Sequence, residues 1–327
     1  MMAASTYREA GVDIQAADRW LSRMRPRIRT THGAAVLKDA GAFAGLFRLP
    51  GGFHDPILVA STDGVGTKLK VAQVVGAHEA IGVDVVAMNT NDVVTYGATP
   101  LFFLDYLAVG RLQPALMSQV LRGIVRGCRA SGCALLGGET AEMPGVLGRG
   151  EYDVAGFCVG IVERAQLLDG SRVRAGDIMI GLASSGVHAN GFSLIRQALS
   201  GTMVRRLGRR LMTPTRIYVR PLLRLLRRVS VSAVVHVTGG GLTRRLPALA
   251  VAHRSLRVHL RPGSWPMPGL FRMIQRAGGL PTEEMLATFN MGIGMALACR
   301  PGDAAAVVRW LRRDGVRAWP IGTIERA

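Results

Sequence analysis

Short runs of β-branched and apolar residues that end in glycines and acids are the feature that most limits what this 327-residue chain can fold into. Each run is typical of a buried strand, and a glycine that follows such a run lets the backbone turn sharply or approach a ligand closely. Strands are expected at residues 57–61, 82–87, 102–109, 134–136, 154–162, 178–182, 231–237 and 289–298. Segments with helical spacing separate them, which favours an α/β fold.

Several helix-like segments carry residues typical of helix ends. Pro114 suits the first turn of a helix over 114–131, and Gly132 suits its end because glycine tolerates a left-handed backbone. Pro221 within the amphipathic segment 216–228 predicts a kink or a new helix start. Further helices are expected over part of 80–96 and at 191–199 and 304–312, and a loop at 205–210.

The length predicts two domains, since a domain takes roughly 100–200 residues. A Gly/Ser/Arg stretch at 168–174 separates two strand-rich blocks and sets the expected domains at 1–170 and 171–327. No run approaches the roughly 20 apolar residues that span a membrane, and the N-terminus lacks an apolar stretch of signal-peptide length. A cytoplasmic location without a membrane partner is therefore expected.

The charge pattern argues against a nucleic-acid partner despite a formal net charge of +19. Of the 41 basic residues three are Lys and the remaining 38 are Arg, scattered along the chain as an Arg-favouring codon bias would leave them. The densest cluster, 205–210, lacks the interleaved aromatic residues of a single-strand binding surface. The four cysteines form no C-x-x-C pair, so buried reduced thiols are expected in place of zinc or a redox centre.

The segment Ser61–Lys68, with the sequence STDGVGTK, directly follows an expected strand. Asp63 at the strand end can ligate Mg²⁺ through oxygen, and Lys68, one of the three lysines, can neutralise a phosphate. The spacing is not that of a P-loop. An ordinary Asp-Gly turn is the alternative, and the segment alone does not decide between the two.

Two further acidic segments point to a site for magnesium and phosphate. Asn91 and Asp92 offer adjacent oxygen ligands near a helix end, and Glu139 follows Gly138 at a strand end. With Asp63, the acids Asp92 and Glu139 suit Mg²⁺, which binds few protein carboxylates and completes its shell with water and phosphate oxygens. The alternatives are local capping by Asp92 and a solvent-facing turn around Glu139.

Two glycine-containing loops follow strands in the second half of the chain. The loop with Ser185, His188 and Asn190 precedes a helix, whose N-terminal N–H groups bind phosphate well, and a plain capping loop is the alternative. The segment 236–241, HVTGGG, predicts a loop pressed against a ligand. His236 can transfer protons near neutral pH, although a lone His is more often structural.

These ordered motifs resemble the AIR synthetase (phosphoribosylformylglycinamidine cyclo-ligase) family, including its D-x4-G-A-x-P signature at Asp92–Pro100. The similar segments span nearly the whole chain, at 7–14, 92–106, 137–145, 152–160, 184–193, 214–219, 236–241 and 288–295. The resemblance implies a two-domain AIR synthetase-like fold. Its N-terminal sheet domain would form a homodimer contact and the ATP site, and its C-terminal mixed α/β domain would contribute to the substrate site.

The resemblance also implies ATP-dependent ring closure of formylglycinamidine ribonucleotide in purine biosynthesis. It assigns Asp63, Asp92 and Glu139 to Mg²⁺, and it assigns Lys68 and His236 to catalysis. The residues expected to contact ATP or its phosphates are Gly41, Gly45, Asp63, Gly64, Thr67, Lys68, Asn91, Asp92 and Gly138. The residues expected to contact the substrate are Ser185, His188, Asn190, Gly239 and Gly240.

The chain departs from the family pattern at three places. The segment 41–45, GAFAG, has fewer glycines than the family, which stiffens a loop expected over the ATP phosphates. Arg25 stands where some relatives have Lys, and the loop around 205–210 is shorter. These departures bear on nucleotide affinity and loop motion more than on the reaction.

Enzymes of the same superfamily are the nearest alternatives. Selenophosphate synthetase usually needs a reactive Cys near its N-terminus, and the first Cys here is Cys128. The segment 138–145 and the full-length similarity disfavour thiamine-monophosphate kinase, and the glutamine-dependent enzyme of the preceding purine step is usually far longer. A non-catalytic protein is the alternative of another class, and the retained acids and the 236–241 loop argue against it.

Overall fold

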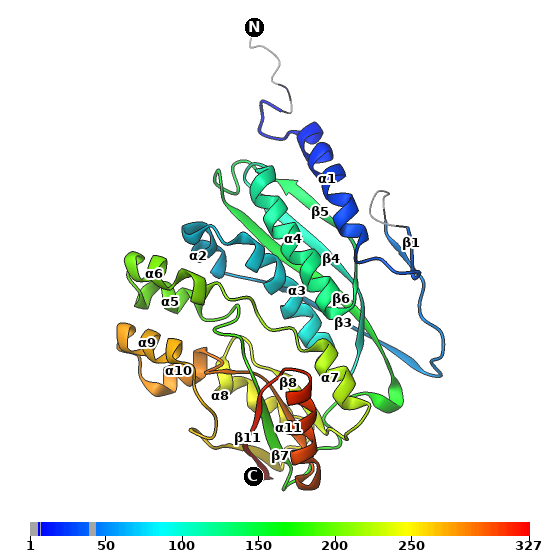
Figure 1. Ribbon diagram of the computed structural model, residues 1–327, viewed down its shortest axis with the longest axis vertical. Helices are drawn as coiled ribbons and strands as arrows, with labels where there is room; N and C mark the ends of the chain where they lie inside the picture. Colours follow the sequence, from blue (N-terminus) through cyan, green and yellow to red (C-terminus); the bar gives the residue numbers. More distant parts are fainter. Residues whose placement is uncertain (1–5, 7, 39–43) are drawn as a thin grey trace.

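The computed structural model describes residues 6, 8–38 and 44–327. They form two sheets with flanking helices, the N-terminal sheet in the upper half of Figure 1 and the C-terminal sheet in the lower half. The last strand of the first sheet ends at Glu163, and the first strand of the second begins at Ile178. The expected mixed α/β architecture is confirmed, while the boundary at residue 170 stays a prediction.

The N-terminal sheet has four strands in the order β3-β6-β4-β5. Strands β4 and β5 run parallel, because helix α4 carries the chain back between them, and the other two pairs are antiparallel. The strands are β3 Pro56–Gly64, β4 Thr99–Val109, β5 Ala134–Glu142 and β6 Tyr152–Glu163, and a separate ribbon pairs β1 Val36–Lys38 with β2 Leu46–Phe47. The helices are α1 Ile14–Arg29, α2 Lys68–Val75, α3 His78–Thr95 and α4 Pro114–Ser131.

The two faces of the N-terminal sheet differ. Helices α3 and α4 cover one face (Figure 1). Phe103 and Cys158 are completely buried there. Side chains alternate between faces along a strand, so their neighbours point the other way. On that second face Leu58 and Phe157 are 56% and 49% exposed. Large exposed apolar side chains on one face of a sheet are typical of an interaction surface.

The C-terminal sheet has five antiparallel strands in the order β8-β10-β7-β11-β9. Alternate residues of β7 serve opposite faces: Ile180 packs with Leu222 and Leu311, while Met179 packs in the core that contains Phe271. The strands are β7 Ile178–Ala183, β8 Ala233–His236, β9 Leu256–Leu260, β10 Ile293–Cys299 and β11 Ala318–Arg326. The helices are α5 Phe192–Ala198, α6 Gly201–Leu211, α7 Val219–Leu226, α8 Gly241–Arg245, α9 Gly269–Gly278, α10 Thr282–Thr288 and α11 Ala304–Arg313.

Two expected elements are wrong. Residues 82–87 are helical, inside α3, and not a strand. This helix is buried on nearly every side, so its apolar run has no polar face to reveal the helical period. Gly82 lets α4 approach, since a Cβ there would lie 1.9 Å from the carbonyl oxygen of Val120. The arginine cluster 205–210 lies in α6 and not in a loop.

Two expectations about the chain as a whole can be compared with the structure. All four cysteines are buried and free, which confirms the expected thiols. Among the described residues, no helix combines the length and the apolar character needed to cross a membrane.

Candidate active site

Asp63, near the C-terminal end of β3, lies where two hollows between the domains meet. One hollow, of about 620 Å³, is lined by the turn 63–67 and by residues 189–194 after β7. The other, of about 440 Å³, is lined by Asp92 and His236 among others. The structure therefore brings four of the five predicted motifs together in one cleft, which we call the interdomain cleft.

Short contacts join the loops of the interdomain cleft, and one of them crosses the domain boundary. Thr67 Oγ1 lies 2.9 Å from Ser193 Oγ. Gly239 lies against Asn190, because a Cβ at Gly239 would be 3.4 Å from Asn190 Oδ1. Gly240, with φ of +96°, begins α8 in a backbone conformation that favours glycine. These residues lie where ligand contacts were expected, and the contacts themselves stay predictions.

Two carboxylates, Asp63 and Asp92, give the interdomain cleft its electrostatic character. Burial raises the pKa of Asp63, and the nearby charge of Asp92 raises it further. The N–H of Gly64, 2.8 Å from Asp63 Oδ1, opposes this rise. The side chain of Asp92 is 40% exposed. Two such acids in partly buried surroundings suit a divalent cation, which would offset both charges.

His236 is held between two side chains of α3. Its Nδ1 lies 2.8 Å from Asp92 Oδ1, and its Nε2 lies 3.4 Å from Asn91 Nδ2. The Asn91 amide is fixed in turn, because Nδ2 donates to the Arg216 carbonyl oxygen and Oδ1 accepts from the Tyr218 N–H. The side chain of His236 is 2% exposed. His236 therefore orients Asp92, and Asn91 ties the two domains together instead of lining the cleft as expected.

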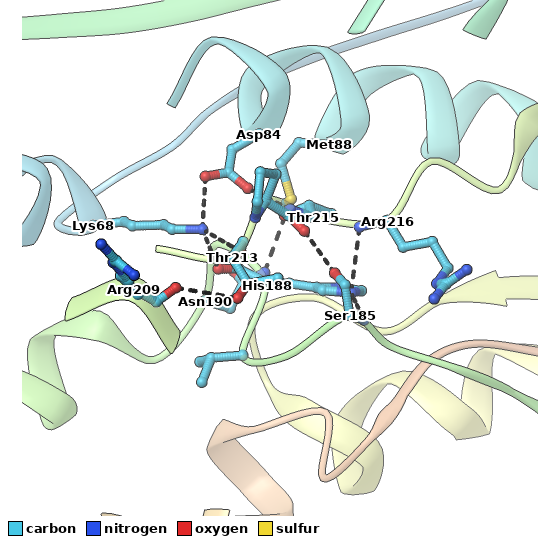
Figure 2. Close-up of polar contacts among 12 residues, drawn as sticks. Lys68, Asp84, Met88, Ser185, His188, Asn190, Arg209, Thr213, Thr215 and Arg216 are labelled. Carbon is cyan, nitrogen blue, oxygen red and sulfur yellow. Dashed lines mark hydrogen bonds and ion pairs between the residues drawn. The ribbon is translucent and has the colours of Figure 1, made fainter. Parts of the chain in front are cut away.

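Lys68 does not lie where a phosphate contact was expected. Its side chain is 0% exposed, and its Nζ lies 2.7 Å from Asp84 Oδ2 (Figure 2). Nζ also donates to the carbonyl oxygens of His188, at 2.8 Å, and Thr213, at 3.1 Å. Three oxygens thus match the three N–H groups of the ammonium, which leaves none for a ligand. The sequence alone does not show that Asp84, sixteen residues later on α3, lies beside Lys68.

The side chains of Ser185 and His188 also point into the protein and not toward a ligand. His188 is buried with φ of +66°, and its Nε2 accepts a hydrogen bond from the Ser185 N–H at 3.1 Å. Burial holds the pKa of His188 well below its usual value, so the ring is neutral. Ser185 Oγ donates to the Pro214 carbonyl oxygen at 2.6 Å. Both side chains fix the loop that carries Asn190.

The expected convergence of Asp63, Asp92 and Glu139 does not occur within one chain. Asp63 pairs with Gly156, Gly156 with Asp105, and Asp105 with Gly138 across the four strands. Three strand spacings, about 14 Å, therefore separate Asp63 from the neighbour of Glu139. Among the described residues, no group of three His, Cys, Asp or Glu side chains could hold a metal ion. The sequence motifs located the strand ends, but the order of the strands in the sheet decides which of these ends lie close together.

Glu139 lines a larger cavity of about 1230 Å³ at the β5 edge, together with Gly45 and Gly138. Gly45 lets the chain pass close to the sheet, since a Cβ there would lie 2.5 Å from Leu136 Cγ. The predicted ATP residue Gly41 lies outside the described residues. Phe47 and Phe102, whose ring centroids are 5.3 Å apart, contribute to the apolar wall of this cavity.

Sequence reasoning missed three residues of these sites. Asp84 and Thr215 complete the buried contacts around Lys68, and their only signal is a lone acid in the apolar part of α3. Asp105 lies in β4 beside Gly138, whose Cβ would be 2.4 Å from Asp105 Oδ1. Burial raises the pKa of Asp105 to about 7, and Glu139 adds to the rise. An acid inside an apolar strand was the available signal.

Comparison with known proteins assigns both domains. The family profile described as AIR synthase related protein, N-terminal domain, matches residues 40–162, and the one described as AIR synthase related protein, C-terminal domain, matches residues 174–327. Among solved structures, thiamine-monophosphate kinase from Stenotrophomonas maltophilia superposes with a TM-score of 0.71 at 21% identity, covering 94% of this chain and 93% of that one. Hydrogenase maturation protein HypE in complex with ATP gives 0.71 at 19% identity, covering 98% and 89%. At such identities the likeness shows the fold alone.

Curated relatives match over nearly the full length. Phosphoribosylformylglycinamidine cyclo-ligases from Gloeothece citriformis and Rippkaea orientalis are 47% and 50% identical, each over 97% of this chain and 96% of the relative. The cyclo-ligase from Gloeobacter violaceus is 48% identical over 98% of both chains. The chain belongs to the phosphoribosylformylglycinamidine cyclo-ligase family of AIR synthase related proteins.

Proposed function

We propose that this chain is an ATP-dependent ligase that converts formylglycinamidine ribonucleotide to 5-aminoimidazole ribonucleotide, with release of ADP and phosphate, in purine biosynthesis. The observation that carries the proposal is 47–50% identity to cyclo-ligases over 97% of the chain. The interdomain cleft supports it, because acids from one domain face loops of the other, an arrangement that can hold two phosphorylated substrates side by side.

The proposed reaction first turns a poor leaving group into a good one. The formyl oxygen of the substrate attacks the γ-phosphorus of ATP, and ADP leaves. An amidine nitrogen then attacks the activated carbon, loses a proton, and phosphate departs with the former formyl oxygen. Catalysis of such a transfer rests on positioning and on offsetting charge, which the two sides of the cleft would supply.

Asp63 and Asp92 are the residues that would hold Mg²⁺ on this chain, since both carboxylates face the interdomain cleft and the charge of Asp92 adds to the raised pKa of Asp63. Mg²⁺ bound there supplies positive charge to the transferring phosphoryl group. His236 keeps Asp92 in place through the 2.8 Å contact at Nδ1. A partner that orients a metal ligand in this way is typical of metal sites.

The remaining roles are proposed from position in the interdomain cleft. Gly64 and Thr67 lie beside Asp63 and suit contact with ATP phosphates. Asn190 and Gly239 suit contact with the ribonucleotide on the other wall. Gly240 completes that wall by allowing the tight turn into α8.

We also propose a cytoplasmic homodimer that forms through the open face of the N-terminal sheet. The exposed Leu58 and Phe157 support this contact. Glu139 and Gly138 lie at the edge strand of the same sheet, about 14 Å from Asp63 within one chain. A nucleotide site that uses Glu139, Gly138 and Gly45 would therefore be completed at the subunit contact.

The decisive test is turnover by the purified protein. With ATP, Mg²⁺ and formylglycinamidine ribonucleotide, we expect ADP release that depends on the ribonucleotide, together with formation of the imidazole product. Asp55→Asn, at the other end of β3 and paired with Arg164, is the matched control for any change at Asp63. A folded dimer without ribonucleotide-dependent ADP release would reject the proposed function.

A further inference from the structure

We propose that Asp84 is a positioning residue, which with Lys68 forms a buried clamp that holds the substrate wall of the interdomain cleft in register with the nucleotide wall. The clamp comprises the side chains of Lys68 and Asp84 and the C-terminal-domain groups that they bind, at His188, Thr213 and Thr215. The proposal rests on the proposed function for its kinetic consequence, and its structural part stands without it.

The clamp crosses the domain boundary through main-chain atoms. Asp84 Oδ1 accepts hydrogen bonds from the N–H and the Oγ1 of Thr215, both at 2.7 Å. Asp84 Oδ2 lies 2.7 Å from Lys68 Nζ, which donates to the carbonyl oxygens of His188 and Thr213. Water does not compete for the contacts that Figure 2 draws, because both side chains are 0% exposed. Two helices of one domain thus hold two separate loops of the other.

The clamp reaches the interdomain cleft through the loop that it holds. Asn190, two residues after His188, lines the cleft and lies against Gly239. His188 itself has the left-handed φ of +66°, a conformation that a residue with a side chain keeps only when its surroundings impose it. The Lys68 contact to its carbonyl oxygen at 2.8 Å is one such restraint. Loss of the clamp would therefore move Asn190 relative to Asp63.

The helix that carries Asp84 also carries Asp92, the proposed Mg²⁺ ligand. Asp84 and Asn91 are seven residues apart on α3, which is two turns, and both bind the segment 213–218. Asp92 follows directly and faces the cleft. A helix that anchors this segment twice fixes the distance between Asp92 and the C-terminal loops.

Stability alone does not account for a buried ion pair at this place. The desolvation of two buried charges commonly offsets their attraction, so apolar residues of similar volume would stabilise the fold equally well. Burial indeed lowers the pKa of Lys68 and raises that of Asp84, against the mutual attraction of the pair. What apolar residues cannot supply is a set of directed contacts to three main-chain groups.

The test compares three variants. Thr215→Val removes one contact of the clamp and no charge, and Lys68→Met/Asp84→Asn removes the charges together with the contacts to His188 and Thr213. Thr90→Val is the matched control, because Thr90 on the same helix donates within the N-terminal domain, to the Val86 carbonyl oxygen at 2.9 Å. We expect kcat/KM for the ribonucleotide to fall about tenfold in the double variant and about threefold in Thr215→Val. The KM for ATP should stay within about twofold in all three.

Hydrogen exchange gives a readout that is independent of turnover. Backbone amides of residues 186–190 and 213–218 should exchange about tenfold faster in the double variant than in wild type, and at the wild-type rate in Thr90→Val. If wild type lacks turnover, the proposed function fails and the exchange rates still decide whether the clamp exists. A double variant with wild-type melting temperature, kcat/KM and loop exchange would overturn the proposal.

Discussion

Asp63 and Lys68 are five residues apart in one glycine-rich segment, yet their charges meet opposite surroundings. Asp63 faces the interdomain cleft beside a second acid, Asp92, and its pKa is raised by burial and by that neighbour. Lys68 is completely buried and meets an acid and two carbonyl oxygens. An uncompensated charge at a cleft is a site for a ligand, whereas a fully compensated buried charge holds structure in place.

The largest expected effect is a loss of activity when Asp63, which faces the interdomain cleft, is substituted. Asp63→Asn should lower kcat by about a thousandfold or more, because a neutral amide binds Mg²⁺ far more weakly than a carboxylate does. Because the pKa of Asp63 is raised in the folded protein, its ionisation subtracts from folding stability, and the variant should melt no lower than wild type. Steady-state kinetics and thermal melts beside Asp55→Asn measure both. A large loss of stability would instead make Asp63 a structural acid.

At the clamp, in contrast, we expect a large effect on stability. Asp84→Asn alone leaves Lys68 buried without its counter-charge, and breaking one side of a buried pair costs about 3–5 kcal/mol. The double variant Lys68→Met/Asp84→Asn should recover most of that loss, since no charge remains buried. Urea unfolding of both variants measures the free energies. Equal losses in the single and double variants would show that the ion pair is not the stabilising element.

A third acid, Asp105, also has a raised pKa, and substituting it measures how much its burial costs the folded protein. Its pKa in the folded protein is raised to about 7 by burial, above the unfolded value. The stability that this group contributes is therefore complete below the unfolded pKa and is lost as the pH rises from about 4 to about 7. Asp105→Asn should remove this loss of folding stability, which we expect to be about 2 kcal/mol at pH 7. This is less than the whole pKa shift would give if the carboxylate had no contact with water. Unfolding at pH 5 and pH 8 measures it. If the dependence of unfolding free energy on pH is the same in the variant and in wild type, water reaches the Asp105 carboxylate in the folded protein.

The residue pattern predicted elements and motifs better than it predicted partners. Strands that end in Gly and acid residues located Asp63, Asp92 and the loop at His236, because those signals are local. Lys68, His188 and Asn91 were expected to contact ligands. Lys68 instead donates to the carbonyl oxygens of His188 and Thr213, 120 and 145 residues away, and Asn91 binds groups that lie 125 to 145 residues away. Glu139 was grouped with Asp63 because sequence gives strand ends without strand order. Long-range pairing decides both points, and no local signal carries it.

The smallest expected effect comes from Lys70, which follows Lys68 by two residues on α2 but is partly exposed to solvent. Lys70 Nζ lies 2.5 Å from Glu151 Oε1, as short as any contact in the clamp, but the two side chains are 43% and 45% exposed. Water and salt screen such a pair, and its net contribution is small. Lys70→Met should shift the melting temperature by less than about 1 °C and leave kcat/KM unchanged. A shift comparable with that of Asp84→Asn would mean that distance, and not burial, sets the strength of these ion pairs.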